Sequence, residues 1–195
     1  MPDSSTEEIF KKSGALLEGH FLLTSGLHSP VYWEKFHVLQ FPDCTSQLCR
    51  MISDHFAGQR VAVVAGPTTG GIILAFEVAR QLGVRGIFAE TEGDSRRVFK
   101  RGLGIRPGER VLVVDDVLTT GKSLREVLAL VAEQGGVVVG IGVLVDRSEQ
   151  EPDFGVPLFS CLRQTTATYS PSDCPLCAAG IPLDKPGGSQ ELQDR

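Results

Sequence analysis

Residues 111–123 read VLVVDDVLTTGKS. The first four residues form an unbroken apolar run, which is typical of a strand buried on both faces. Two adjacent acids, Asp115 and Asp116, follow the run, and a short threonine and glycine loop comes next. The loop leads into residues 122–134, whose apolar spacing predicts an amphipathic helix. A buried strand, a short loop and a helix together indicate one unit of an α/β fold.

The same alternation continues on both sides of this stretch. Apolar runs at 61–65, 86–89 and 137–145 predict further buried strands, and helical spacing recurs at 42–56 and 72–82. Strands that alternate with helices form βαβ units, which place the strands parallel in one sheet. We therefore predict an α/β fold in which a central, mostly parallel sheet is flanked by helices.

The two ends of the chain differ from this central region. Residues 5–17 predict a helix, and residues 20–40 predict two short strands around a turn. From about residue 150 onward proline, glycine and serine become dense, and we expect residues 186–195 to form a disordered tail.

Composition limits the class of protein. The 195 residues are 42% hydrophobic and 22% charged, which fits one soluble globular domain. The net charge of −5 counts against nonspecific nucleic-acid binding, which usually requires a basic face. No apolar run approaches the roughly 20 residues that span a bilayer. The first residues lack an apolar signal core, so a cytoplasmic location is expected.

The loop after the two acids is suited to a phosphate. Loop amides and a helix N-terminus attract an anion, Thr119, Thr120 and Ser123 add hydroxyl donors, and Gly121 permits close approach of the backbone. Carboxylates just upstream accept hydrogen bonds from a vicinal diol, so a phosphosugar is the expected ligand. An ordinary strand end with a capped helix explains only part of this run. The stretch is not a Walker loop, because Asp116 stands where that motif requires glycine.

A second small-residue turn, AGPTTGG at residues 65–71, lies between a predicted strand and a predicted helix. Its backbone amides can face an anion, although a tight βα turn alone also explains its composition.

Residues 91–108 form a long polar connection with no clear element of its own, and four bases occur in it: Arg96, Arg97, Lys100 and Arg101. Such a charge run is usually a solvated surface. Because this one lies beside a predicted phosphate site in an acidic protein, we interpret it as a lid.

The five cysteines and four histidines give weaker signals. An odd number of cysteines without a signal peptide indicates reduced thiols. Zinc at Cys174 and Cys177 would need about two more ligands, and no second CxxC or paired histidines lie near them in the sequence. We therefore favour a tail turn with two semi-buried thiols over a metal or redox site. The histidines show no ligand spacing and receive no catalytic role: His20, His28, His37 and His55.

Residues 111–123 match the phosphoribosyl-pyrophosphate (PRPP) signature, and from about residue 7 to 188 the chain resembles the type I phosphoribosyltransferases. Within that family it is most similar to the orotate phosphoribosyltransferases. The segments that carry this second resemblance are GHFLLTSGLHSP at 19–30, Asp146 with Arg147, FGVP at 154–157, CPLC at 174–177 and GIPL at 180–183.

The resemblance implies a division of roles on the donor side. Asp115 and Asp116 would hold the ribose hydroxyls, and the following loop would cradle the 5-phosphate. The residues implied for PRPP binding are Asp115, Asp116, Val117, Leu118, Thr119, Thr120, Gly121, Lys122, Ser123, Pro67, Thr68, Thr69 and Gly70. Gly70 stands where the best-known bacterial form has a lysine. The catalytic residues implied are Lys100, Arg101, Arg97 and Asp116, the three bases acting from a lid that covers the neighbouring subunit's pyrophosphate.

The resemblance also implies which residues bind the acceptor, orotate. The residues assigned to orotate are Thr24, Ser25, Tyr32, Trp33, Thr119 and Arg147. Thr24 replaces a lysine of the common bacterial form, which leaves Arg147 as the main candidate for the orotate carboxylate. Strand aromatics are more often core residues, and a strand-end arginine can simply pair with Asp146, so both alternatives stay open.

The resemblance implies transfer of the phosphoribosyl group of PRPP to orotate, a pentosyltransferase reaction of pyrimidine biosynthesis, with Mg²⁺ as cofactor and a homodimer as the assembly. It also implies one domain with a PRPP-binding core at 41–149 and a hood, formed by 1–40 and about 150–185, that binds the base. The alternatives are a purine phosphoribosyltransferase and a non-catalytic PRPP-sensing regulator. Neither a membrane nor a nucleic acid is expected as a partner.

Overall fold

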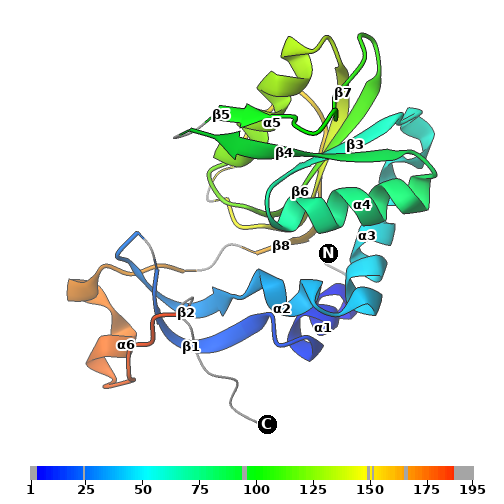
Figure 1. Ribbon diagram of the computed structural model, residues 1–195. Coiled ribbons are helices and arrows are strands. Elements are labelled where there is room, and N and C mark those ends of the chain that lie inside the picture. The colour runs from blue at the N-terminus through cyan, green and yellow to red at the C-terminus, as the bar shows by residue number, and fades with distance from the viewer. Residues whose placement is uncertain are drawn as a thin grey trace.

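Six strands form the main sheet of the protein (Figure 1). The computed structural model describes residues 4–23, 25–93, 96–148, 150, 152–164 and 167–186. The strand order across the sheet is β5-β4-β3-β6-β7-β8, and every neighbouring pair is parallel except β4 with β5. The strands are β3 (Val63–Pro67), β4 (Arg85–Glu92), β5 (Arg96–Val98), β6 (Arg110–Leu118), β7 (Val137–Asp146) and β8 (Leu158–Arg163).

Helices cover both faces of this sheet. Helices α3 (Pro42–Phe56) and α4 (Gly70–Leu82) pack on one face, and α5 (Lys122–Glu133) packs on the other. Strand β6 shows why both faces need cover: Leu112 and Val114 join the α3/α4 core, whereas Val111 and Val113 join the α5 core. Successive side chains of a strand point to opposite faces, so an unbroken apolar run can serve two cores. The predicted α/β fold is confirmed.

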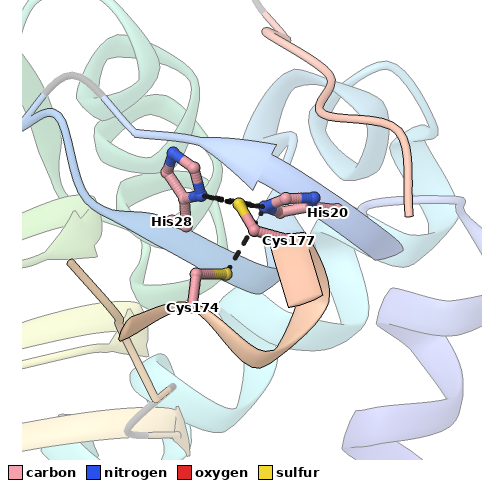
Figure 2. Close-up of side chains that lie close together, drawn as sticks. All are labelled: His20, His28, Cys174 and Cys177. Carbon is pink, nitrogen blue, oxygen red and sulfur yellow. Dashed lines mark hydrogen bonds between the residues drawn. The ribbon is translucent and has the colours of Figure 1, made fainter. Parts of the chain in front are cut away.

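A two-stranded antiparallel hairpin lies apart from the main sheet. Strand β1 (Leu16–Leu22) pairs with β2 (His28–Trp33), between helix α1 (Ser4–Lys12) and helix α2 (Lys35–Leu39). The C-terminal segment returns to this hairpin: Asp184 N–H donates to the His20 carbonyl, and Leu22 N–H donates to the Asp184 carbonyl. Figure 1 shows α6 (Pro175–Ala178) beside the hairpin, and Figure 2 shows side chains of the two segments facing each other. Two short 3-10 helices complete the structure, η1 (Ala57–Gln59) and η2 (Pro171–Asp173).

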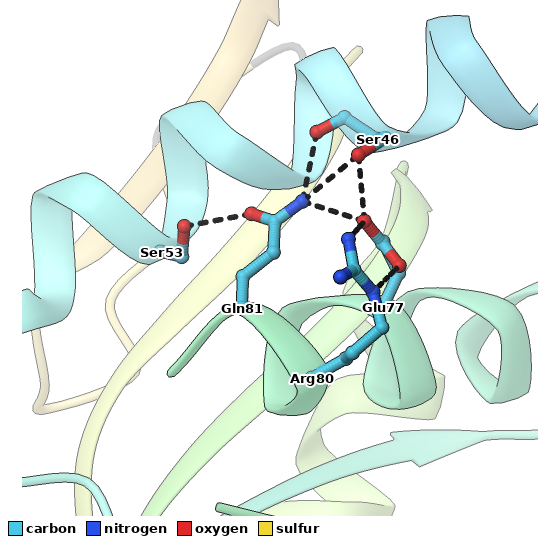
Figure 3. A network of polar contacts seen from close by, with 5 residues as sticks. All are labelled: Ser46, Ser53, Glu77, Arg80 and Gln81. Carbon is cyan, nitrogen blue, oxygen red and sulfur yellow. Dashed lines mark hydrogen bonds and ion pairs between the residues drawn. The ribbon is translucent and has the colours of Figure 1, made fainter. Parts of the chain in front are cut away.

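A polar network joins α3 to α4 (Figure 3). Glu77 on α4 accepts hydrogen bonds from Ser46 at 2.7 Å and from both Nε and Nη2 of Arg80 at 2.8 Å. Gln81 Nε2 donates to Glu77 at 2.7 Å, and its Oε1 accepts from Ser53 at 2.8 Å. Helix α4 starts at Gly70, so this network fixes the helix that follows the AGPTTGG turn.

Several predicted boundaries are wrong. The first helix ends at Lys12 rather than near residue 17, because Gly14 adopts a left-handed φ of 67° and Ala15 N–H bonds back to the Phe10 carbonyl, as at a Schellman C-cap. Residues 91–108 are not a plain loop, because β4 extends to Glu92 and pairs with β5. Strand β8 was not predicted, and it lies in a region dense in proline and glycine. The end of the proposed disordered tail, from residue 187 on, lies outside the described residues.

None of the helices among the described residues is both long enough and apolar enough to traverse a lipid bilayer.

Candidate active site

A pocket of about 370 Å³ opens beyond the carboxyl ends of the central strands. Ligands of open α/β folds bind at this edge, because loops and helix N-termini converge there. The pocket lining comes from the end of β4, from β5 and from the β6–α5 junction: Thr91, Arg97, Val117, Leu118, Thr119, Thr120, Gly121, Lys122, Ser123, Leu124 and Glu126. The structure therefore brings the whole predicted phosphate loop into one cavity.

The loop is shaped by Gly121. It caps the N-terminus of α5 with a φ of 75°, a left-handed conformation that favours glycine. A Cβ at this position would lie 2.8 Å from Cζ of Phe154, so close packing also requires glycine. The first amides of a helix have no partner within the helix and carry partial positive charge. Glycine thus allows the start of α5 to face the pocket, as an anion site requires.

Asp115 and Asp116 lie within β6, just before the pocket lining begins at Val117. Both are buried, with exposed fractions of 6% and 3%. The Ser123 hydroxyl donates to Asp115 Oδ2 at 2.7 Å, so the first residues of α5 are tied to the strand. Asp116 Oδ1 accepts from the Val117 amide at 2.7 Å. These contacts hold both carboxylates at fixed positions next to the phosphate loop.

The AGPTTGG turn meets the same carboxylates from the neighbouring strand β3. Gly70 is buried, and a Cβ built on it would collide with the carboxylate of Asp116. The peptide bond between Thr68 and Thr69 is cis, and the Thr68 amide donates to the Ala89 carbonyl at 3.0 Å. Any side chain at position 70, including the lysine of the best-known bacterial form, would therefore displace the Asp116 carboxylate from its place in this structure.

The four bases of the predicted lid separate into two groups. Arg97 lines the pocket, and its Nη1 donates to the Thr68 hydroxyl at 2.7 Å while its Nε lies 3.3 Å from Glu126. Lys100 pairs with Glu92 at 3.3 Å and Arg101 with Glu90 at 2.9 Å, and neither lines the pocket. Arg96 pairs with Glu133 at 3.7 Å and does not line this pocket either. The structure thus joins Arg97 to the AGPTTGG turn and leaves the other three cations paired with acids outside the pocket.

The aromatic pair of β2 divides between two environments. Trp33 is 5% exposed and packs edge-on against Phe10 in the core, with ring centroids 5.1 Å apart. Tyr32 points to the opposite face, as strand alternation requires, and packs against Phe21 at 5.8 Å. The core interpretation therefore holds for Trp33, and only Tyr32 remains near the predicted base side. Ser25 lies exposed in the hairpin turn, and Thr24 lies outside the described residues.

Arg147 follows β7 directly next to the phosphate loop. Its amide donates to the Leu118 carbonyl at 2.8 Å, and Asp146 is the register partner of Leu118. Burial lowers the pKa of the Arg147 guanidinium, and the nearby Tyr32 acts in the opposite direction. Its Nε is buried and has no hydrogen-bond partner among the described residues. The Asp146 carboxylate instead accepts from the Ser148 hydroxyl and faces Arg163 at 3.6 Å, so a simple Arg147–Asp146 pair is not what the structure shows.

Mg²⁺ prefers carboxylate, phosphate and water oxygens, and the carboxylates that would suit it here are the buried Asp115 and Asp116, with Glu126 in the pocket lining.

The surroundings of Cys174 and Cys177 differ from what the sequence indicated. Cys174 is buried and Cys177 is exposed, and His20 and His28 lie against them (Figure 2). Sequence spacing gave no signal, since the histidines precede the cysteines by about 150 residues. Only the return of the C-terminal segment to the hairpin brings the four together.

Comparisons with known proteins agree with this geometry. The phosphoribosyl transferase domain family matches residues 44–165. An orotate phosphoribosyltransferase of Pelotomaculum thermopropionicum is 54% identical over 92% of this chain and 94% of the relative. One from Caldanaerobacter subterraneus is 51% identical over 92% and 94%, respectively. The crystal structure of orotate phosphoribosyltransferase from Aeropyrum pernix superposes with a TM-score of 0.69 at 29% identity, over 80% of this chain and 92% of that one. The chain therefore belongs to the phosphoribosyltransferase family and, within it, to the orotate phosphoribosyltransferases.

Proposed function

We propose that this protein transfers the phosphoribosyl group of PRPP to orotate, giving orotidine 5′-monophosphate and pyrophosphate. The observation that carries the proposal is the convergence of three segments at one sheet edge. The phosphate loop follows β6, Gly70 packs against Asp116, and Arg97 joins the AGPTTGG turn to the pocket. This arrangement offers an anion site on each side of a pair of buried carboxylates, which matches a sugar with phosphates at both ends.

These segments bind different parts of PRPP. The loop Thr119–Ser123 and the N-terminus of α5 bind the 5-phosphate through amides and hydroxyls. Asp115 and Asp116 accept hydrogen bonds from the ribose hydroxyls. The turn formed by Pro67, Thr68, Thr69 and Gly70 holds the pyrophosphate, and Arg97 supplies the positive charge nearest to it. Lys100 and Arg101 act from the outer edge of the hairpin, as a lid over the pyrophosphate of a neighbouring subunit.

The acceptor enters from the hood side, which we assign to the β1–β2 hairpin and the C-terminal segment. Arg147 fits a carboxylate, because a guanidinium fork bonds both carboxylate oxygens and a partly buried site strengthens those bonds. Tyr32 lies near Arg147 and offers a ring face and a hydroxyl to a planar base. We also assign Ser25 and Thr119 to the orotate-binding site.

The reaction exchanges one bond at ribose C1 for another. The bond from C1 to the pyrophosphate oxygen breaks, and a ring nitrogen of the anionic orotate forms the new bond to C1. Glycosyl transfers pass through an oxocarbenium-like state, so no covalent protein nucleophile is required. The residues of this chain align the two reactants, stabilise charge on the leaving pyrophosphate and exclude water. Mg²⁺, held with the pyrophosphate near Asp115 and Asp116, would supply further charge neutralisation of the leaving group.

A homodimer is part of the proposal. Four large apolar side chains are exposed on α4 and around α2 and the start of α3: Phe36, Phe41, Ile73 and Phe76. Phe76 is 68% exposed, which is unusual for phenylalanine on a monomeric surface. A second copy of the chain, related by two-fold symmetry, would cover them.

The test uses purified protein with Mg²⁺, PRPP and one base at a time: orotate, adenine, hypoxanthine or guanine. We expect the ultraviolet absorbance of orotate to fall with stoichiometric release of pyrophosphate, and the purines to remain unchanged. Turnover of a purine without orotate consumption would replace the proposal with the purine alternative. PRPP binding without any turnover would leave only a regulator.

A further inference from the structure

Four potential metal ligands converge where the C-terminal segment meets the β1–β2 hairpin. His20 and His28 come from the two strands of the hairpin, and Cys174 and Cys177 come from the start of α6 and from within it (Figure 2). One ligand atom from each residue lies within 4.8 Å of all the others. Three of the residues are buried, and Cys177 is at the surface. All four are outside the lining of the candidate active site.

The spacing of the ligand atoms suits a small tetrahedral cation. His20 Nε2 lies 2.9 Å from His28 Nδ1, 3.5 Å from Cys174 Sγ and 3.7 Å from Cys177 Sγ. Cys177 Sγ lies 3.3 Å from His28 Nδ1. Ordinary zinc–nitrogen and zinc–sulfur bond lengths in a tetrahedron place such ligand atoms about 3.3–3.8 Å apart. The two imidazole nitrogens lie closer than this and the widest separation in the cluster reaches up to 4.8 Å, so the imidazoles would move apart and the most distant ligand would move inward to admit the ion.

A hydrogen bond outside the cluster orients His20. Its Nδ1 lies 2.8 Å from the Ile181 carbonyl oxygen, which can only accept. Nδ1 therefore carries the proton, and Nε2 directs a lone pair at His28 and the two thiols. Metal-ligating histidines commonly donate their other ring N–H to a carbonyl in this manner, because the bond fixes the tautomer and the ring orientation.

We propose that His20, His28, Cys174 and Cys177 bind one Zn²⁺ in a closed structural site. Two thiolates and two imidazoles in a tetrahedron favour zinc, whereas Mg²⁺ and Ca²⁺ prefer oxygen ligands. Four protein ligands leave no open position for water or substrate, which distinguishes a structural from a catalytic site. Binding balances as one Zn²⁺ taken up and two thiol protons released, with no change of oxidation state.

The ion would fasten the C-terminal segment to the hairpin. That attachment otherwise includes a few backbone bonds, such as those between Asp184 and His20 and between Tyr169 and His28, and the bond from His20 Nδ1 to the Ile181 carbonyl. A link between residues so distant in sequence removes much conformational freedom from the unfolded chain. The same hairpin carries Ser25 and Tyr32, so the zinc would also stabilise the base side of the candidate active site.

The first test is the metal content of the full chain, purified under reducing conditions without chelator and then supplied with Zn²⁺. We expect about one zinc per chain. The double variant Cys174→Ser/Cys177→Ser should lose it, whereas Cys44→Ser, which alters a thiol outside the cluster, should retain it. Zinc-free protein, a Cys174–Cys177 disulfide under reducing conditions, or unchanged zinc in the double variant would each overturn the proposal.

A second test needs no variant and therefore does not depend on whether the double variant folds. Co²⁺ added to chelator-treated wild-type protein should give the visible absorption of a tetrahedral site together with thiolate-to-cobalt charge transfer. A weak octahedral spectrum would refute the proposed ligand set. Chelation should also lower Tm by about 5 °C or more, and Zn²⁺ should restore it. An unchanged Tm on chelation would contradict a structural role, independently of any transferase assay.

Discussion

Gly70 packs so closely against Asp116 that a Cβ at position 70 would collide with the Asp116 carboxylate. This contact connects the pyrophosphate turn after β3 with the paired acids of β6. The best-known bacterial form has a lysine at this position. A lysine here would displace the carboxylate that we assign to the ribose, so any lost positive charge must come from elsewhere, and Arg97 is the nearest candidate on the structure.

The first prediction concerns Gly70→Ala. We expect kcat/KM for PRPP to fall about 100-fold, because a small displacement of an aligned group can cost that much. Overpacking should also lower the free energy of unfolding by about 1–3 kcal/mol. Steady-state kinetics and urea unfolding measure the two effects. The control is Gly58→Ala, where a Cβ meets nothing within 4 Å, and it should behave like the wild type. Normal kinetics for Gly70→Ala would refute the close contact.

The second prediction concerns Arg147→Ala. We expect KM for orotate to rise about 10- to 100-fold, the equivalent of a lost charge-assisted hydrogen bond or two, with little change in PRPP binding. Arg147→Lys should recover only part of the affinity, because lysine lacks the planar fork. The exposed Arg106→Ala is the matched control and should leave both substrates unaffected. An equal loss for orotate and PRPP would show that Arg147 acts on the loop beside it instead.

The third prediction separates Arg97 from its neighbour. Arg97→Ala removes the hydrogen bond to Thr68 and the cation that lines the pocket, so KM for PRPP should rise about tenfold or more. Arg96→Ala should have no such effect, since the Arg96 side chain is 72% exposed and its ion pair with Glu133 is long, at 3.7 Å. Initial rates at varied PRPP concentration give KM for PRPP in both variants. Equal effects of the two substitutions would mean that PRPP binding depends on the overall charge of the hairpin and not on the position of Arg97.

The fourth prediction concerns the outer cations of the hairpin. Lys100→Ala/Arg101→Ala breaks two partly exposed ion pairs, and such pairs contribute little to stability, so Tm should change by no more than about 2 °C. If these residues form a lid, kcat should nevertheless fall, and PRPP hydrolysis without orotate should increase. Pyrophosphate release with and without orotate measures both. Unchanged rates would remove Lys100 and Arg101 from the catalytic assignment.

The fifth prediction concerns the stability of the α3–α4 contact. The hydrogen bonds from Arg80, together with those from Ser46 and Gln81, lower the pKa of Glu77 from 4.5 to about 2. A carboxyl with a depressed folded pKa stabilises the fold fully above its unfolded pKa and loses that contribution as pH falls toward its folded value. Glu77→Gln should therefore cost about 1–2 kcal/mol at pH 7, and the difference should shrink below about pH 4.5.

Urea unfolding of the wild type and Glu77→Gln at pH 7 and at about pH 3.5 checks this dependence. Glu133→Gln is the control, because the Glu133 side chain is 59% exposed and makes only a long ion pair, so its removal should change little at either pH. A difference that grows toward acid pH would contradict the assignment to Glu77.

The predicted sheet was largely correct because its signals are local. The apolar runs at 86–89, 111–114 and 137–145 lie within strands, the run at 61–65 overlaps β3 from Val63 on, and the helix at 42–56 has the predicted bounds. The two acids and the loop that follows them could also be placed, since a strand, a turn and a helix fix the direction of a short segment. The errors occur where neighbours in space decide: β5 exists because it pairs with β4, and β8 because β7 offers it an edge.

The sequence by itself determined the α/β fold and the phosphate loop, because hydrophobic periodicity and turn residues act over a few positions of the chain. Tertiary structure alone decided which of two adjacent aromatics enters the core, that Gly70 packs against Asp116, and which arginine reaches the pocket. It also decided that His20 and His28 meet Cys174 and Cys177. Such contacts join residues that are far apart in sequence, and their geometry exists only once the segments have packed.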